Sequence, residues 1–486
     1  MILLWQGGIF VKKFLKLLYS TFVFILVFNF VACGKNSNNL DSQNVTETPK
    51  CSHDFKLTQL AVESQTEEFK TGIYTCSKCN NTKELEVGYK EIGLPVIDFT
   101  GSLEGISKEN ELKISVKYSS EEQAFDCDAK IKVQGATSAS YPKKNYTIKL
   151  YEKDTDYNKK HKVELVDGWG KENKYCLKAN WVDYSQARNV VSAKLYGQIV
   201  NSRTTEDKIN ELYNGGAIDG YPVVIYLNNS FLGLYTMNIP KDKWLFDMDD
   251  YDPDEDTEIR KEAILMADTW TNSTFLKETI NSDFISSGWE LEFCSTEGTD
   301  IGTKWVTESF NKFINFLKNN DGEDLKSGLS NYVDIDRAID CLIYTNLLYA
   351  RDNVAKNILW VTYDGVKWIP SMYDMDGTWG LMYDGSMYDE YSQSLIGHLL
   401  NEKLFKNYKI EIKNRYSELR SEVLSLSNIT STFESFFELI PEIIRDVEQL
   451  KWSEVPSQKE NNLEQILEFT SIRLSVLDEY FVFNNN

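Results

Sequence analysis

Apolar and polar residues alternate along the first half of this chain. The alternation is clear in "ELKISVKYSS", "AKIKVQG" and "NYTIKLYEK", residues 111–120, 129–135 and 145–153. This period of two predicts antiparallel strands with one buried face. "KYCLKANW", residues 174–181, continues the pattern as a further strand.

A helix and a hairpin follow these strands. "SQARNVVSAKLYGQIV", residues 185–200, has the spacing of an amphipathic helix, and Ser185 is in place to cap it. "YPVVIYLNNSFLGLYTMNIPKDKW", residues 221–244, predicts two strands joined at Asn228-Asn229, because asparagine tolerates the positive φ of a tight turn.

Helical periodicity dominates the second half of the chain. It is present in residues 308–320 and 334–350 and from about residue 392 to the end. The sequence therefore predicts an α+β fold, with a β-rich part over residues 93–245, a helical part over 246–486 and a cleft between them.

The N-terminus has the pattern of an export signal. Residues 11–33, "VKKFLKLLYSTFVFILVFNFVAC", have a basic start, an apolar run and a small residue before cysteine. The ending "FVAC" resembles a bacterial lipobox, which predicts a signal peptide over residues 1–33 and lipidation of Cys33. An uncleaved transmembrane anchor is the alternative, because the apolar run approaches the span of a bilayer. Residues 34–50 are polar and predict a flexible tether.

Residues 51–92 carry a possible metal-binding set. Cys51, His53, Cys76 and Cys79 form a Cys-X-His pair followed by a Cys-X-X-Cys pair. Three thiolates and one imidazole suit a tetrahedral structural zinc site without an open position. The stretch resembles small zinc-ribbon-like modules of bacterial surface proteins. A disulfide between two of the cysteines is the alternative in an oxidising compartment.

Charge and the remaining cysteines narrow the functional class. The formal net charge of −22 argues against a nucleic-acid partner, because binding to phosphate backbones needs a Lys/Arg excess. Divalent cations suit such a chain better. We interpret Cys127, Cys176, Cys294 and Cys341 as buried free thiols, although their pairing cannot be derived from sequence.

Residues 350–380, "ARDNVAKNILWVTYDGVKWIPSMYDMDGTWG", concentrate acidic and amide groups at unusual places. Asp352 and Asn357 bracket a loop, a strand and a returning strand follow, and Asp374 and Asp376 stand where the second strand ends. Because a hairpin returns its far end to its origin, Asp352 and Asp374 are expected in one cleft. That is the outline of a site for phosphate and metal.

The spacing Asp352-x-x-x-x-Asn357 matches the protein-kinase catalytic loop, although no HRD or DFG motif is present. The wider segment resembles the CotH kinase family, atypical kinases similar to spore coat protein H. "VQGATSASYPKKNYTIKL", "LKANWVDYSQARN" and "VVIYLNNSFLGLYTM" extend this resemblance over about residues 93–475. Gln134-Gly135-Ala136-Thr137 departs from the Arg-Gly-Asn-Ser of the family.

The resemblance implies a two-lobed kinase-like fold that transfers the γ-phosphate of ATP to an exported or cell-surface protein, with Mg²⁺ or Mn²⁺. It implies Asp352 as the base or hydroxyl-orienting group. Asn357 and Asp374 are then metal ligands, and Asp376 is the alternative or second ligand.

The cation that contacts the phosphates is left open by the sequence. Lys144 lies in the stretch similar to the PKK of the family, whereas Lys178 resembles the strand lysine of ordinary kinases. We place Lys144 first and Lys143 third. Arg188 is interpreted either as a partner of a cleft carboxylate or as a helix cap. Residues 135–144 are either a loop over the phosphates or a plain hairpin loop.

Two other functions fit the same sequence. One is a kinase-like surface adhesin or scaffold without turnover, and the other is transfer of AMP from ATP bound in reverse. For each reading we expect a membrane-anchored lipoprotein outside the bacterial cytoplasm.

Overall fold

The computed structural model describes residues 51–60, 71–205, 207–458 and 460–483. The chain divides into two units, residues 1–52 and 53–486, and only Cys51 and Ser52 of the first are described. The predicted signal peptide, the tether and Cys33 therefore lie outside the described residues. Within the described residues, no helix combines the length and the apolar character that crossing a membrane requires.

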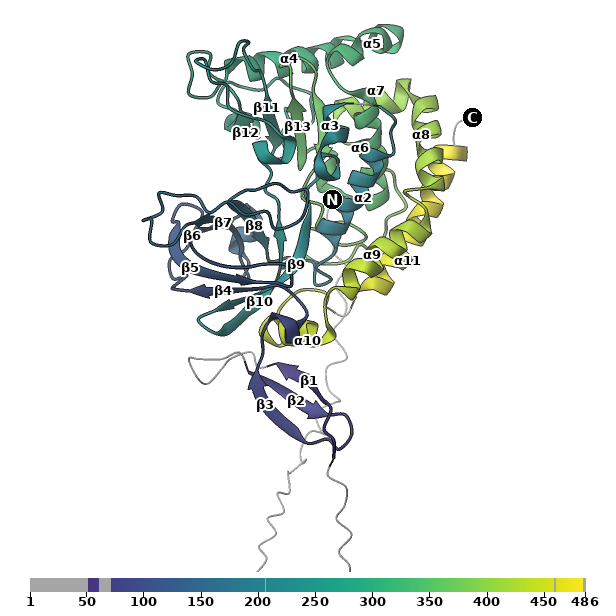
Figure 1. The fold of residues 1–486 in the computed structure, drawn as a ribbon. Coiled ribbons are helices and arrows are strands. Elements are labelled where there is room, and N and C mark those ends of the chain that lie inside the picture. The colour runs from purple at the N-terminus through teal and green to yellow at the C-terminus, as the bar shows by residue number, and fades with distance from the viewer. Residues whose placement is uncertain (1–50, 61–70, 206, 459, 484–486) are drawn as a thin grey trace, which may run out of the picture. The chain divides into compact units, whose positions relative to one another are not determined.

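A small antiparallel sheet opens the described part of the second unit. It consists of β1 (Phe55–Leu60), β2 (Thr71–Cys76) and β3 (Thr82–Glu86) in sequential order. The short helix α1 (Tyr89–Ile92) ends at Gly93, whose φ of 76° is easily adopted only by glycine. The sheet also lies against helix α10 (Glu442–Lys451) through β1 (Figure 1).

The β-rich part is a closed barrel in which the strand order is β10-β8-β7-β6-β5-β4-β9. Its strands are β4 (Val96–Thr100), β5 (Leu112–Ser119), β6 (Ala124–Gln134), β7 (Asn145–Tyr151), β8 (Lys174–Lys178), β9 (Gly220–Leu227) and β10 (Ser230–Asn238). The parallel pair β4–β9 closes a sheet that is otherwise antiparallel. The predicted strands and the Asn228-Asn229 turn are confirmed, and both asparagines have positive φ.

The second half contains a sheet that the helical pattern did not predict. It is four-stranded, in the order β12-β11-β13-β14. Its strands are β11 (Ala263–Ala267), β12 (Trp289–Cys294), β13 (Ile358–Thr362) and β14 (Ile369–Met372). The hairpin β13–β14 was predicted and is confirmed. Strand β11 is buried at every position, so its sequence has no alternation to reveal it.

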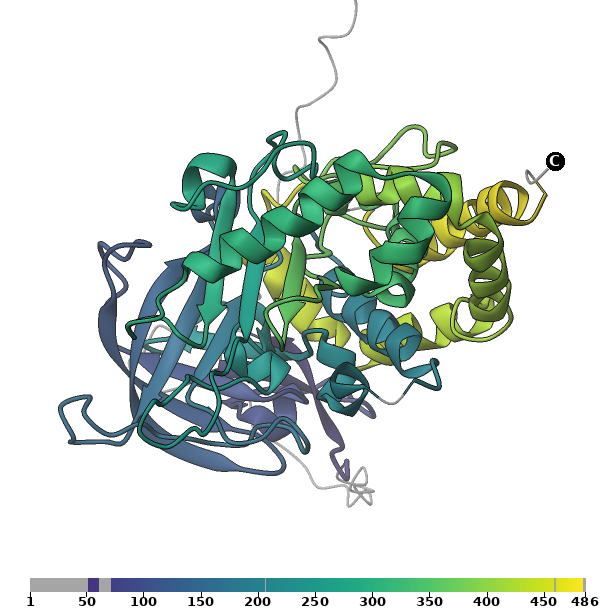
Figure 2. The ribbon, with the colours of Figure 1, turned by 90° about the horizontal axis from the view of Figure 1, so that it is seen from above.

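Helices surround this sheet and the side of the barrel (Figure 2). They are α2 (Arg188–Asn201), α3 (Lys208–Glu211), α4 (Lys304–Asn319), α5 (Gly322–Gly328), α6 (Ile335–Leu348), α7 (Leu399–Asn407), α8 (Lys409–Ser421), α9 (Leu426–Glu438), α10 and α11 (Leu463–Leu477). The α+β class is therefore confirmed.

Helix α2 begins later than predicted. Its first residue is Arg188, and the Arg188 N–H donates to the Asp183 carboxylate at 2.8 Å. Ser185 Oγ accepts the Ala187 N–H at 3.3 Å and a side-chain N–H of Arg188 at 3.1 Å, so Asp183 rather than Ser185 receives the first main-chain N–H of this helix. The predicted Ser185 cap is wrong because the chain makes one more turn before the helix starts.

Helix α6 carries a buried carboxylate that fixes its neighbours. Asp340 is completely buried and accepts hydrogen bonds from Arg203 and Arg415, each at 2.7 Å. A buried carboxylate needs such partners to offset its lost hydration. The four thiols at Cys127, Cys176, Cys294 and Cys341 are buried and free, as predicted.

His398 gives the fold a measurable pH dependence. It is buried, its Nδ1 accepts the Asn401 N–H at the start of α7, and burial lowers its pKa to about 4. The unfolded chain binds this proton below about pH 6.5 and the folded chain only near pH 4. The free energy of unfolding should therefore fall by ~3 kcal/mol as pH decreases across this window.

Denaturant unfolding at several pH values measures this slope. His398→Asn keeps a good capping group and should flatten the slope between pH 6.5 and 4. The same slope in wild type and variant would contradict the assignment.

Candidate functional site

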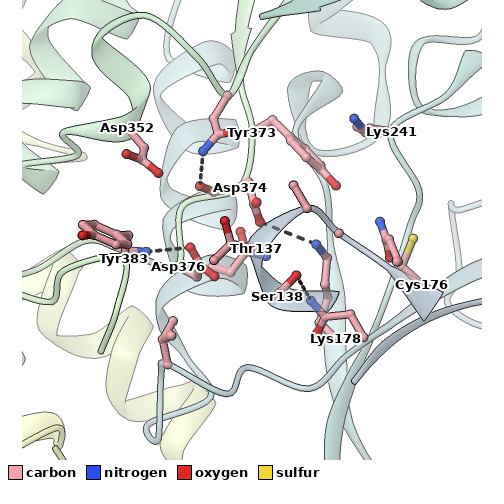
Figure 3. A pocket seen from close by; sticks show the side chains of 18 of the residues that line it. Thr137, Ser138, Cys176, Lys178, Lys241, Asp352, Tyr373, Asp374, Asp376 and Tyr383 are labelled. Carbon is pink, nitrogen blue, oxygen red and sulfur yellow. Dashed lines mark hydrogen bonds and ion pairs between the residues drawn. The ribbon is translucent and has the colours of Figure 1, made fainter. Parts of the chain in front are cut away.

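A cavity of about 1020 Å³ lies between the barrel and the hairpin β13–β14. Its walls come from strands β6 to β8, from the loop after β6 and from the segments that flank the hairpin. Figure 3 shows Asp352 and Tyr383 at one end, Asp374 and Lys178 in the middle, and Lys241 and Cys176 at the other.

The barrel wall of the cavity is polar because the side chains on one face of its strands point away from the barrel core and into the cavity. Alternate residues of β6, β7 and β8 line it: Lys132, Gln134, Asn145, Thr147, Lys149, Lys174, Cys176 and Lys178. The residues between them, such as Tyr146, Ile148 and Leu177, are buried in the core. The pleat of the sheet thus separates an apolar core from a polar wall.

The loop between β6 and β7 also lines the cavity. It contains a short 3₁₀ turn, Thr137–Ser140, and begins at Gly135, whose φ is 101°. A Cβ on Gly135 would lie 2.0 Å from Ser138 Oγ, so a side chain cannot be accommodated. Asn145 Nδ2 donates to the same oxygen at 3.1 Å. The loop joins the antiparallel strands β6 and β7 and lines the cavity through residues 135–138.

The hairpin β13–β14 brings its two flanking loops together, as predicted. Asn353 Nδ2 donates to Asn357 O at 3.1 Å and to Tyr373 O at 2.8 Å. Asn357 and Asp374 have φ of 57° and 49°, a conformation that Asn and Asp tolerate better than most residues. Together with Asp352, these side chains line one cavity.

Asp376 is the third carboxylate of this acidic end. Burial, the nearby Asp374 carboxylate and the more distant Asp352 raise the pKa of Asp376 to about 7, although Lys178 opposes the shift. One Asp376 oxygen accepts the Gly377 N–H at 2.8 Å. The three carboxylates are thus close enough to repel one another, which is a condition that a bound cation relieves.

Lys178 is the predicted lysine that reaches the acidic end. Its Nζ lies 3.5 Å from Asp374 Oδ1 and 5.7 Å from the centre of the Tyr373 ring. Burial opposes the charge on Lys178, but Asp374 and further negative neighbours raise its pKa above the usual value. The last residue of β8 therefore remains a cation in the cavity.

Lys144 and Arg188 have other partners. Lys144 Nζ donates to Ala139 O at 2.8 Å and does not line the cavity. Arg188 is completely buried, bonds Asp183 at 2.6 Å and donates to Thr378 O at 3.0 Å. The geometry thus favours Lys178 over Lys144, and it gives Arg188 the role of joining α2 to the segment after Asp376.

Seven more cations line the cavity that sequence reasoning did not single out. They are Lys108, Lys132, Lys149, Lys174, Lys241, Arg351 and Lys356. Lys356 Nζ lies 3.3 Å from the carboxylate of Asp352, four residues earlier in the chain. Its position next to Asn357 in the sequence could have identified Lys356 as a residue of the site. The negative net charge of the whole chain does not describe the charge of the cavity wall. The cations that line the cavity are Lys108, Lys132, Lys143, Lys149, Lys174, Lys178, Lys241, Arg351 and Lys356.

A second cluster lies at the small sheet. The ligand atoms of Cys51, His53, Cys76 and Cys79 all lie within 4.8 Å of one another. Burial opposes ionisation of the Cys76 thiol, but hydrogen bonds led by the Lys78 N–H lower its pKa to about 5. Among the described residues, this is the one group of three or more Cys, His, Asp and Glu side chains close enough together to share an ion.

Cations and oxygen ligands line this cavity together, an arrangement that suits phosphate and metal. The family model described as CotH kinase protein matches residues 131–477. The chain therefore belongs to the CotH kinase family, as its motifs indicated. No curated protein matches the chain.

Proposed function

We propose that this protein transfers the γ-phosphate of ATP to a hydroxyl group of an exported or cell-surface protein. The proposal depends on one observation, the approach of Lys178 to Asp374 beside Asp352 and Asn357 in the cavity. If the fold is a two-lobed kinase-like fold, the barrel lobe supplies the cation Lys178, and the segments beside the hairpin β13–β14 supply the carboxylates.

The donor set of the acidic end fits a magnesium ion. Asn357, Asp374 and Asp376 offer amide and carboxylate oxygens, the ligands that Mg²⁺ prefers. The three cavity aspartates do not form one ligand group, which suits a division between metal ligands and a separate base. When bound, Mg²⁺ neutralises phosphate charge.

Asp352 has the position of the base. Its carboxylate accepts the proton of the acceptor hydroxyl as the new O–P bond forms. The bond to the bridging oxygen of the γ-phosphate then breaks, and ADP leaves with that electron pair. Lys356 balances the charge beside Asp352, and Lys178 contacts the phosphates.

Transfer of AMP is the second candidate, since one observation favours it. Lys149 and Lys174 are paired across β7 and β8, next to the Thr147–Cys176 pair of the cavity wall. Figure 3 places Cys176 and Lys241 at the end remote from Asp352. Lys149, Lys174 and Lys241 offer a second place for phosphates, which ATP bound in the reverse orientation requires. The mass added to a substrate separates phosphoryl from adenylyl transfer.

The N-terminal segment completes the proposal. We place the protein at the outer face of a bacterial membrane, anchored through a lipid on Cys33 and with the signal peptide removed. The substrate is then a protein of the same compartment.

The base role predicts a specific loss of rate. Asp352→Asn should lower kcat by ~10²–10⁴, because it removes the proton acceptor. The KM for ATP should change little, since Lys178 and the metal ligands stay in place. Labelling of a generic acceptor protein with ATP and Mg²⁺ or Mn²⁺ measures both constants.

Asp300→Asn is the matched control, because Asp300 is exposed and does not line the cavity. Equal labelling by wild type and Asp352→Asn would remove Asp352 from the reaction. An absence of labelling in both would support the adhesin reading.

We also propose a structural zinc ion at His53, Cys76 and Cys79 with Cys51 as the fourth ligand. Cys79 Sγ lies 3.2 Å from His53 Nδ1, and the set leaves no position for a reactant. Such an ion would stabilise the small sheet, whose β3 is exposed throughout.

Metal analysis of the purified protein tests this assignment. We expect one zinc per chain, lost in Cys79→Ser and retained in the control Cys294→Ser, which removes a buried thiol outside the set. Wild-type protein purified without zinc would contradict it.

A further inference from the structure

Lys143 stands at the end of the loop that lines the cavity, and its ammonium group is fully engaged by the protein. It donates to Ala179 O at 2.9 Å, to Leu234 O at 2.5 Å and to Glu448 Oε1 at 2.6 Å. An ammonium group has three donors, so none remains for a phosphate. Lys143 therefore does not act as a phosphate ligand, although its side chain borders the cavity.

Glu448 reaches this position from α10, far along the chain. Its second carboxylate oxygen accepts the Leu234 N–H at 2.7 Å. Both side chains of the pair are almost completely buried, with exposed fractions of 1% and 4%. Two buried charges are retained against a large desolvation cost only where their geometry is well satisfied, as it is here.

The barrel is shaped to admit this ion pair. The register of β10 against β9 shifts between Phe231 and Gly233, and Gly233 has φ of 154°. A Cβ at Gly233 would lie 2.8 Å from Lys143 Cε and 3.2 Å from Glu448 Oε2. The irregular strand and the missing side chain leave the space that the pair fills.

Aromatic side chains make a second connection between the same loop and the end of α10. The rings of Tyr141 and Trp181 stack at 6.4 Å, and Trp181 meets Trp452 edge-on at 6.0 Å. Trp452 Nε1 donates to Leu232 O at 3.0 Å. The Tyr141 hydroxyl donates to Tyr383 O at 3.3 Å, across the acidic end.

The anchored loop lies where a ligand of the cavity is expected. Gly135 to Ser138 and Tyr141 line the cavity, and Figure 3 places Thr137 and Ser138 beside Lys178. The loop forms only a short 3₁₀ turn and belongs to no strand between β6 and β7. Holding such a loop in one conformation before binding lowers the entropy lost on binding.

We propose that Lys143 and Glu448 are positioning residues, by which helix α10 holds the loop of residues 135–141 in the conformation that binds a nucleotide. The identity of the ligand rests on the proposed function, whereas the hold on the loop does not. Because β1 also lies against α10, the small sheet supports the helix that carries Glu448.

Hydrogen exchange of the full chain without ligand tests the hold on the loop. Glu448→Ala should speed exchange of the amides in residues 135–141, because Lys143 loses its partner. Affinity for ADP with Mg²⁺, measured by calorimetry, should fall by about tenfold. Glu448→Gln keeps an acceptor for the Leu234 N–H and should give smaller changes of both kinds.

Asp340→Asn is the matched control. It also removes a buried, paired carboxylate, but one on α6 whose partners are Arg203 and Arg415 rather than residues of the loop or of α10. It should lower stability without changing loop exchange or ADP affinity. The same loop and affinity changes in Asp340→Asn would overturn the proposal, because they would reflect general destabilisation.

A paired substitution covers the case in which Glu448→Ala does not fold. Lys143→Met with Glu448→Leu removes both charges at similar volume, which buried pairs generally tolerate. Loop exchange should stay raised in this folded variant, and wild-type exchange would overturn the proposal. If wild type binds no ADP while Glu448→Ala still frees the loop, the positioning role stands and the proposed function fails.

Discussion

The contact between Lys178 and Asp374 is the interaction on which the site depends. It joins the last residue of β8 in the barrel to the second residue after β14 in the second sheet, at 3.5 Å. The Lys178 side chain is buried whereas the Asp374 side chain is 35% exposed, so the carboxylate offsets part of the desolvation cost of the buried ammonium group. The pair also marks where cations of the barrel wall meet oxygen ligands of the hairpin. Under the proposed function, a phosphate with its metal ion would contact both groups.

Much of this site could be predicted from sequence because its spacing is local. Asp352, Asn357 and Asp374 are joined by one short hairpin, and a hairpin has few ways to arrange its ends. The strands of the barrel were also predictable, because the alternation of apolar and polar residues is a local pattern in the sequence. Strand β11 was not, since a strand buried on both faces has no period of two. In β12, "WELEFC", the alternation was present and could have been used.

Long-range partners were beyond the reach of sequence patterns. Lys144 and Lys178 could be ranked only by resemblance, because the approach of Lys178 to Asp374 depends on tertiary packing whereas Lys144 turns back to Ala139 in its own loop. The pairing of Lys143 with Glu448 spans most of the chain, and no local period indicates it. The net charge of −22 likewise describes the whole surface and conceals a cavity rich in lysine.

The central claim is that Lys178 is the cation of a nucleotide-binding cavity. The most direct measurement is calorimetric titration of wild type, Lys178→Met and Lys144→Met with ATP in the presence of Mg²⁺. The structure predicts that Lys178→Met loses most of the affinity and that Lys144→Met keeps it, because only Lys178 of these two lines the cavity. Equal affinity for ATP in wild type and Lys178→Met would contradict the account.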